Sequence, residues 1–140
     1  MELWIIYALL SAAFAGAVAI LGKIGIQNID STLATTVRAV VMATFLVLVS
    51  LSIGKAKLLS TIDSKALTFI VLSGIAGALS WLFYFVALKT GPASAVAALD
   101  RLSVVFVVVL AVLFLGESLT LKSGLGVVLL TCGAILMTIK

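Results

Sequence analysis

The sequence predicts an all-α integral membrane protein with five transmembrane helices. Of its 140 residues, 64% are hydrophobic and only 10% are charged, whereas a soluble domain carries about 25% charged residues. The apolar residues also lie in continuous runs, each close to the roughly 20 residues that an α-helix needs to cross a bilayer. A transmembrane barrel would instead alternate apolar and polar residues over segments of about ten residues.

Five apolar runs are the expected helices, and they fill a single domain over residues 1–140. They cover residues 3–22, 32–53, 66–88, 93–115 and 121–139. The stretches Asp30-Ser31-Thr32 and Asp63-Ser64 stand at the starts of the second and third runs, and Ser118 or Thr120 opens the fifth. Short polar side chains at these places cap the free N–H groups of a first helical turn. Pro92, the only proline, comes just before the fourth run, where its missing N–H costs nothing.

Small residues recur inside the first, third and fifth runs. Small side chains let helix backbones approach closely in lipid, so we interpret these positions as helix-packing surfaces, with generic bundle packing as the simplest reading. The candidates are Ala12, Gly16, Ser73, Gly77, Gly124, Gly126 and Gly133.

The residue content excludes several chemistries. There is no histidine, and the single cysteine, Cys132, lies in an apolar run. A histidine-based metal site, a Ser-His triad and an intrachain disulfide therefore cannot form, and we expect no metal, no cofactor and no enzyme activity. The net charge is +4, but its lysines cluster at the ends of apolar runs, where they anchor helices at a membrane surface. The expected partners are thus membrane lipids and not nucleic acid.

Five helices place the two ends of the chain on opposite sides of the membrane. The loop lysines then divide four to three between the sides. Those on the N-terminal side are Lys55, Lys57, Lys65 and Lys122, and those on the other side are Lys23, Lys89 and Lys140. This weak bias is compatible with one fixed topology and also with insertion in both orientations.

Three charged residues lie inside apolar runs: Arg38, Asp100 and Arg101. Counting 8 residues inward from Asp30, Pro92 and Lys89, which flank the runs on one face of the membrane, reaches Arg38, Asp100 and Trp81. Eight residues of helix correspond to roughly 12 Å, so these side chains are expected in one layer below that face. Tyr84 lies one turn from Trp81, nearer the surface.

Two interpretations of this layer are open. Adjacent residues on a helix point about 100° apart, so Asp100 pairs better with Arg38 than with Arg101, and such a neutralised pair would hold two helices together. Alternatively, the layer lines a substrate path, because buried charges in membranes usually face a cavity. Its surplus positive charge would then suit an anionic or zwitterionic organic solute. Ser103, one turn beyond Asp100, is a further candidate lining residue.

The junctions between the runs resemble those of a known family. The stretches YFVALKTGPAS and FLGESLT, at residues 84–94 and 114–120, are similar to the EamA-like proteins of the drug/metabolite transporter superfamily. The stretch STLATTVRAVVMATFLVL, which contains Arg38, resembles the second helix of that family. The resemblance covers nearly the whole chain.

Full-length members of that superfamily have ten helices, arranged as two inverted five-helix repeats. The resemblance implies that this chain is one such half, and that it is a secondary transporter of small organic metabolites in the cell membrane. An antiparallel homodimer would recreate the inverted pair that alternating access exploits. The alternative function is a non-transporting or heteromeric membrane subunit that pairs with another five-helix protein.

Overall fold

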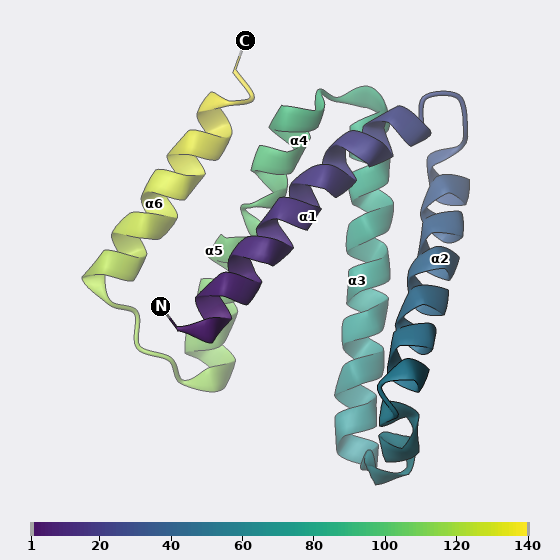
Figure 1. Ribbon diagram of the computed structural model, residues 1–140. Coiled ribbons are helices and arrows are strands. Elements are labelled where there is room, and N and C mark those ends of the chain that lie inside the picture. The colour runs from purple at the N-terminus through teal and green to yellow at the C-terminus, as the bar shows by residue number, and fades with distance from the viewer. Residues whose placement is uncertain (1, 140) are drawn as a thin grey trace. The chain divides into compact units, whose positions relative to one another are not determined.

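A computed structural model describes residues 2–139, and the regular structure in that range is entirely helical (Figure 1). The all-α prediction is therefore confirmed. The elements are α1 (Leu3–Gly25), α2 (Ser31–Ser52), η1 (Lys55–Thr61), α3 (Ser64–Thr90), α4 (Ala93–Asp100), α5 (Ser103–Leu110), η2 (Ala111–Leu115) and α6 (Leu121–Leu136).

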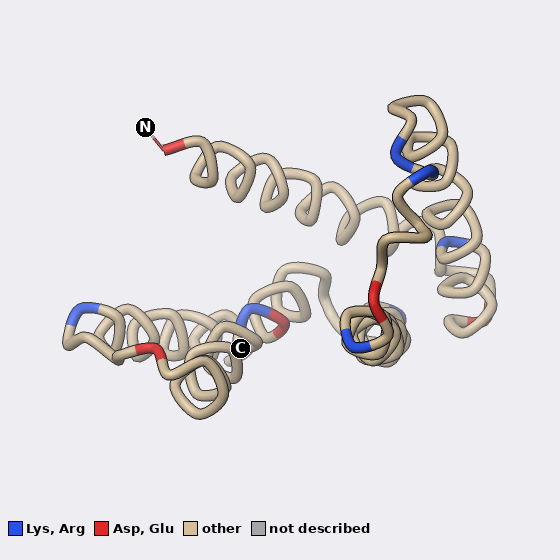
Figure 2. The backbone as a smooth tube through the Cα atoms, turned by 90° about the horizontal axis from the view of Figure 1, so that it is seen from below, with Lys and Arg blue, Asp and Glu red and all other residues tan. Residues whose placement is uncertain are grey.

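Within residues 2–139, four helical stretches are long and apolar enough to cross a membrane: α1, α2, α3 and Ala93–Leu115. Figure 2 shows that charged residues are few along the chain and leave long helical stretches without charge. The fifth predicted span is shorter than expected, because α6 has 16 residues and ends at Leu136. There the N–H of Thr138 donates to the carbonyl of Ile135 at 2.9 Å, a tighter turn than the α-helix makes.

The chain divides into two compact units. The central unit, Gly22–Lys89, contains the end of α1 with α2, η1 and α3. The terminal unit combines Met1–Leu21 with Thr90–Lys140 and contains the rest of α1 with α4, α5, η2 and α6. Inside the terminal unit, α6 packs against α4 and α5.

Helix starts are capped by the residues that the sequence indicated. The Asp30 carboxylate accepts hydrogen bonds from the N–H groups of Thr32 and Leu33, at 2.8 and 3.0 Å. The Asp63 carboxylate likewise accepts from the first turn of α3 at 2.8 Å. Of the two candidates for α6, Thr120 is the N-cap, since its hydroxyl accepts from the N–H of Ser123 at 3.1 Å. These caps satisfy N–H groups that a helix leaves free.

The predicted helix over residues 93–115 is not continuous. Its first part, α4, ends at Asp100, and its second part, α5, begins at Ser103. Between them the N–H groups of Arg101 and Leu102 donate to carbonyls three residues back, at 3.2 and 2.9 Å. This is 3₁₀ spacing, which narrows the helix locally. The charged pair thus stands where the α-helix is interrupted, a feature that hydropathy could not reveal.

The same stretch ends in a π-helical turn, η2. The N–H of Glu117 donates to the carbonyl of Ala111 at 3.2 Å, and Gly116 has φ 67°. That left-handed conformation strains residues with a Cβ atom, so Gly116 ends the span at little cost.

Lysine side chains connect the helix ends of the central unit. The Lys23 amine donates to the carbonyl of Leu88 and, at 3.4 Å, to that of Lys89. The Lys89 amine donates to the carbonyl of Ile29 at 2.8 Å. The last carbonyls of a helix lack N–H partners and carry partial negative charge, so a cation stabilises them. The ends of α1 and α3 and the loop before α2 are therefore tied together.

The end of α1 also approaches α3 closely at Gly22. A Cβ atom at this position would lie 3.2 Å from Cζ of Phe85 and 3.5 Å from Cδ1 of Leu88. Leu88 is fully buried, and Phe85 is nearly so. Gly22 therefore permits the close packing beside the Lys23 contact, a role that the sequence analysis did not assign to it.

Candidate functional site

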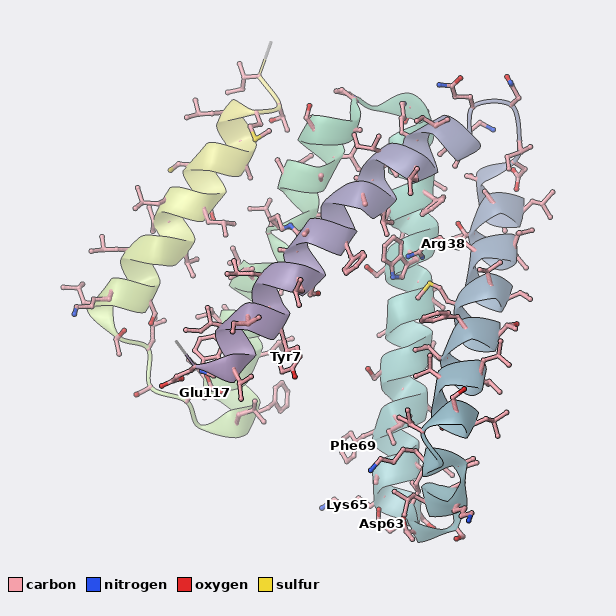
Figure 3. The ribbon with its side chains drawn as sticks, viewed as in Figure 1. Tyr7, Arg38, Asp63, Lys65, Phe69 and Glu117 are labelled. Carbon is pink, nitrogen blue, oxygen red and sulfur yellow. The ribbon has the colours of Figure 1, made fainter. Side chains whose placement is uncertain are left out.

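The candidate site is centred on Arg38, a half-buried cation in the middle of α2. Its side chain reaches from α2 toward α3 (Figure 3), and its Cζ atom lies 3.6 Å from the centre of the Trp81 ring. The Phe85 ring is 5.6 Å from the same atom. A guanidinium over an indole face gains a cation–π attraction that strengthens away from water.

Two aromatic side chains on α3 hold the indole of Trp81 in place. The rings of Trp81 and Tyr84 meet edge to face, with centroids 5.4 Å apart, and the Trp81 and Phe85 centroids are 6.0 Å apart. Residues three and four apart are neighbours on one helix face. The spacing of these aromatic residues in the sequence is therefore enough to gather them, and Arg38 from α2 covers the face of Trp81.

A cavity of about 770 Å³ lies between α2 and α3, entirely within the central unit. Its walls include Arg38 and Met42 from α2 and Gly77, Ala78 and Trp81 from α3. This volume falls in the range of about 300–1,000 Å³ that is usual for small-molecule sites. The small residues of α3 leave room for the cavity, and the predicted packing residue Gly77 is one of its lining residues.

The wall near the start of α2 carries three threonines whose hydroxyls are already engaged. Thr35 donates to the carbonyl of Ser31 at 2.8 Å, and Thr36 to that of Thr32 at 2.9 Å, while the Thr32 side chain hydrogen-bonds to Asp30. Such back-bonding satisfies the hydroxyl within its own helix. These threonines therefore offer the cavity hydrogen-bond acceptors but no free O–H donor for an anion.

Arg38 is the one charged residue among the described residues that line this cavity. Its guanidinium has the Trp81 face on one side and finds no hydrogen-bond acceptor within residues 2–139. An arginine carries five N–H donors in a planar fork that matches a carboxylate or phosphate. The site can therefore bind an anionic group.

The other predicted path residues lie in the terminal unit. Asp100, Arg101 and Ser103 stand at the interruption between α4 and α5, and all three are exposed. Arg38 belongs to the central unit, so the suggested Asp100–Arg38 pair and the shared layer stay predictions. Of the predicted path residues, the structure brings together Arg38, Trp81 and Tyr84.

The predicted packing glycines lie in open positions. A Cβ atom added at any of them would meet nothing within 4 Å among the described residues of its own unit: Gly16, Gly77, Gly124, Gly126 and Gly133. With Ala12 and Ser73, they stay predicted packing positions.

Comparison with known proteins places the whole chain in one family. The EamA-like transporter family matches residues 2–139. The chain belongs to the EamA-like transporter family. A protein of Sinorhizobium sp., described as an uncharacterized transporter in the cobO 3′ region, is 43% identical over 136 residues, which cover 97% of this chain and 96% of that protein.

A second relative of this EamA-like protein comes from the archaeon Methanocaldococcus jannaschii. That uncharacterized protein is 37% identical over 78 residues, which cover 56% of this chain and 57% of the relative. No solved structure matches the chain. Family membership together with the four apolar spans makes this a multi-pass membrane protein.

Proposed function

We propose that this EamA-like protein is a secondary transporter of small organic metabolites in the cell membrane, working as an antiparallel homodimer by alternating access. The observation that carries the proposal is the cavity between two membrane-spanning helices, with the Arg38 guanidinium available to a solute. A charge inside a span is costly, and such residues generally serve a substrate path or a structural pair. The Sinorhizobium relative, which matches over nearly its whole length, is described as a transporter.

The exposed charges of the terminal unit favour a dimer, whereas its exposed apolar side chains do not decide the question. Few residues of the four spans are buried within the chain, and large side chains such as Phe14, Phe106 and Phe114 are at least 69% exposed. Lipid is able to cover those apolar groups. Asp100 and Arg101 are exposed within an apolar span, and a second copy would give these charges polar surroundings that lipid does not.

The antiparallel arrangement rests on the near-even division of the loop lysines, four on one side and three on the other. Such a balance supplies little positive-inside preference. Two copies inserted oppositely would form the inverted pair of a ten-helix transporter, with each chain supplying one half. Inverted repeats give a transporter two equivalent states, open to opposite sides.

Topology is tested with single cysteines. Cys132 is first replaced by alanine, and cysteine is introduced either at Asn28, before α2, or at Ser64, at the start of α3. The full chain is then labelled in intact cells with a membrane-impermeant maleimide. We expect each site to label partly from outside and to reach full labelling after permeabilisation. Labelling of one site only from outside and of the other only from inside would rule out the antiparallel arrangement.

Transport itself is tested in proteoliposomes. A panel of amino acids, organic acids and amines is screened by thermal shift on the purified chain, and every stabilising compound is then tested for flux. We expect flux of at least one compound above empty liposomes, and at least tenfold lower flux in Asp100→Asn or Arg101→Gln. Two results would favour the heteromeric subunit. One is thermal stabilisation of the chain by a compound without flux of any compound. The other is purification of the chain only in complex with a different five-helix protein.

A further inference from the structure

The cavity between α2 and α3 carries an inference about the class of solute that it takes. It combines one available cation with walls that are mostly apolar and, among the described lining residues, carry no other charge. We propose that this cavity binds an organic monoanion, with its carboxylate or similar acid on Arg38 and an apolar body between the helices. This inference rests on the proposed function only for the biological role of the bound solute. Binding itself is tested separately from flux.

The charge of the solute follows from the charge of the walls. Among the described residues that line the cavity, Arg38 is charged and no carboxylate is present. A cationic solute would find no counter-charge there and would be repelled by Arg38. A zwitterion would leave its ammonium group unpaired in apolar surroundings, which is unfavourable. A single negative charge is therefore the best match, which narrows the choice between an anionic and a zwitterionic solute.

The orientation of Arg38 defines how the acid binds. Trp81 covers one face of the guanidinium, at 3.6 Å. The N–H groups point outward in the plane of the guanidinium, so stacking on an aromatic ring leaves them free to bond in that plane. A carboxylate can then accept two parallel hydrogen bonds, while the indole restricts the rotation of the arginine. The pre-ordered cation loses less conformational freedom when the anion binds.

The body of the solute follows from the remaining walls. The hydroxyls of Thr35 and Thr36 donate to carbonyls of their own helix, so they can only accept hydrogen bonds from a sugar or a polyol. Met42, Leu46, Ile75 and Ala78 supply hydrocarbon surface. A hydroxyl-rich body would lose more hydrogen bonds to water than these few acceptors can replace. An aromatic or alkyl body instead gains free energy from burial.

The test uses four probes on the full chain in detergent. 4-Phenylbutyrate, 4-phenylbutanamide and 4-phenylbutylamine share one apolar body and carry negative, zero and positive charge, and inorganic phosphate is an anion without such a body. The chain has two tryptophans, Trp4 and Trp81, so Trp4→Phe makes fluorescence report Trp81 alone. We expect saturable changes with phenylbutyrate and at least tenfold weaker responses to the other three probes.

Two pairs of variants separate the roles of charge and space. Arg38→Gln should weaken phenylbutyrate binding by about 10- to 100-fold, as expected for loss of charged hydrogen bonds, and Arg38→Lys should lie between. Lys122→Gln removes the same charge from the exposed first turn of α6 and should change nothing. Gly77→Leu adds a side chain where a Cβ meets nothing within 4 Å, so it should fill the cavity and weaken binding. Gly126→Leu, equally unobstructed but outside the cavity, is its control.

Several results would overturn this inference. One is an equal response to the three charged and neutral phenyl probes, and another is unchanged binding in Arg38→Gln. A third is Trp81 emission that changes with protein concentration but not with any of the four probes. That result would mean that a second copy of the chain occupies the cavity. Phenylbutyrate binding without flux of any solute would remove the transport proposal and keep this one. Flux of a cation or a neutral solute that does not depend on Arg38 would keep the transport proposal and overturn the inference that the cavity binds an organic monoanion.

Discussion

Arg38 in the central unit and the Asp100–Arg101 pair in the terminal unit are both charges inside apolar spans. Arg38 stands in an uninterrupted helix of 22 residues and lies over Trp81. Asp100 and Arg101 are exposed, and the α-helix is interrupted beside them. Arg38 has an aromatic partner within its own unit, and the helix that carries it stays regular. An exposed pair coincides with a local change of backbone, which is the more typical setting for groups that act on a solute or a second chain.

Removal of the Trp81 ring, which lies against Arg38, should have the largest effect on the free energy of unfolding. Trp81→Ala eliminates the cation–π contact and the packing of a large half-buried side chain, so we expect the free energy of unfolding to fall by about 2–4 kcal/mol. Unfolding in mixed micelles titrated with SDS measures it. Phe83→Ala, two residues along the same helix at a site 68% exposed, is the control and should cost far less. Equal losses in both variants would mean that Arg38 does not depend on Trp81.

The exposed pair should behave in the opposite way. In the double variant Asp100→Ala and Arg101→Ala, we expect the free energy of unfolding to stay level or to rise by about 1–3 kcal/mol, since isolated charges in a span are costly. Transport should fall at the same time. The same SDS titration, together with flux of the solute found in the screen, gives both values. A loss of stability as large as that of Trp81→Ala would show that Asp100 and Arg101 stabilise the fold instead of serving transport.

The lysine contacts of the central unit predict a smaller effect. Lys23→Met removes the hydrogen bonds from its amine to the carbonyls at the end of α3, and we expect a loss of about 1 kcal/mol in the free energy of unfolding. Lys65→Met at the start of α3 is the matched control. A positive charge is unfavourable at a helix start, so its removal should be neutral or slightly stabilising. If both variants cost the same, the Lys23 contacts contribute nothing specific.

The smallest effect concerns the cap of α2, and it depends on pH. The Leu33 N–H donates to the Asp30 carboxylate and holds its pKa below the ordinary value of 3.8. A carboxyl whose pKa is lowered by folding stabilises the protein above its unfolded pKa and loses that contribution as pH falls through the folded value. Asp30→Ala should lower the thermal midpoint by a few degrees at pH 7, and Asp30→Asn should retain it.

Thermal melts between neutral pH and pH 3 check this prediction. The gap between the natural protein and Asp30→Ala should shrink only below the ordinary carboxyl pKa of 3.8. Asp30→Asn should keep its own advantage over Asp30→Ala throughout, because an amide does not titrate in this range. A gap that is constant over the whole series would show that the charge of Asp30 is not involved.

Local chemistry made much of this fold predictable. Asp30, Asp63 and Thr120 cap the helices that they precede because a short polar side chain reaches only the N–H groups next to it. Counting residues along α2 and α3 placed Arg38 and Trp81 at one depth, and the structure brings their side chains together. Such features depend on spacing along one or two elements, which the sequence contains directly.

Other features could not be predicted in this way. The interruption after Asp100 changes backbone hydrogen bonds to three-residue spacing at Arg101, Leu102, Val104 and Val105. It leaves the hydropathy of the span unchanged. The contacts of Lys23 and the close packing at Gly22 join segments more than 60 residues apart. The residues next to Lys23 and Gly22 in the sequence do not indicate which distant residues they contact. The donation of the threonine hydroxyls to their own helix likewise removes free donors from a wall that the sequence presents as polar.

The π-helical turn at η2 has a consequence for how this chain tolerates changes of length. A π-helical turn contains one residue more than an α-helical turn, and η2 lies at the end of a span, directly before Gly116. Deletion of one residue there should convert it to an ordinary α-helical turn while leaving every side chain of α5 on its original face. The same deletion between Arg38 and the start of α2 would turn Arg38 by about 100° around the helix. The end of that span is thus a place where this chain should tolerate the loss of one residue without a change in the charged segment before it.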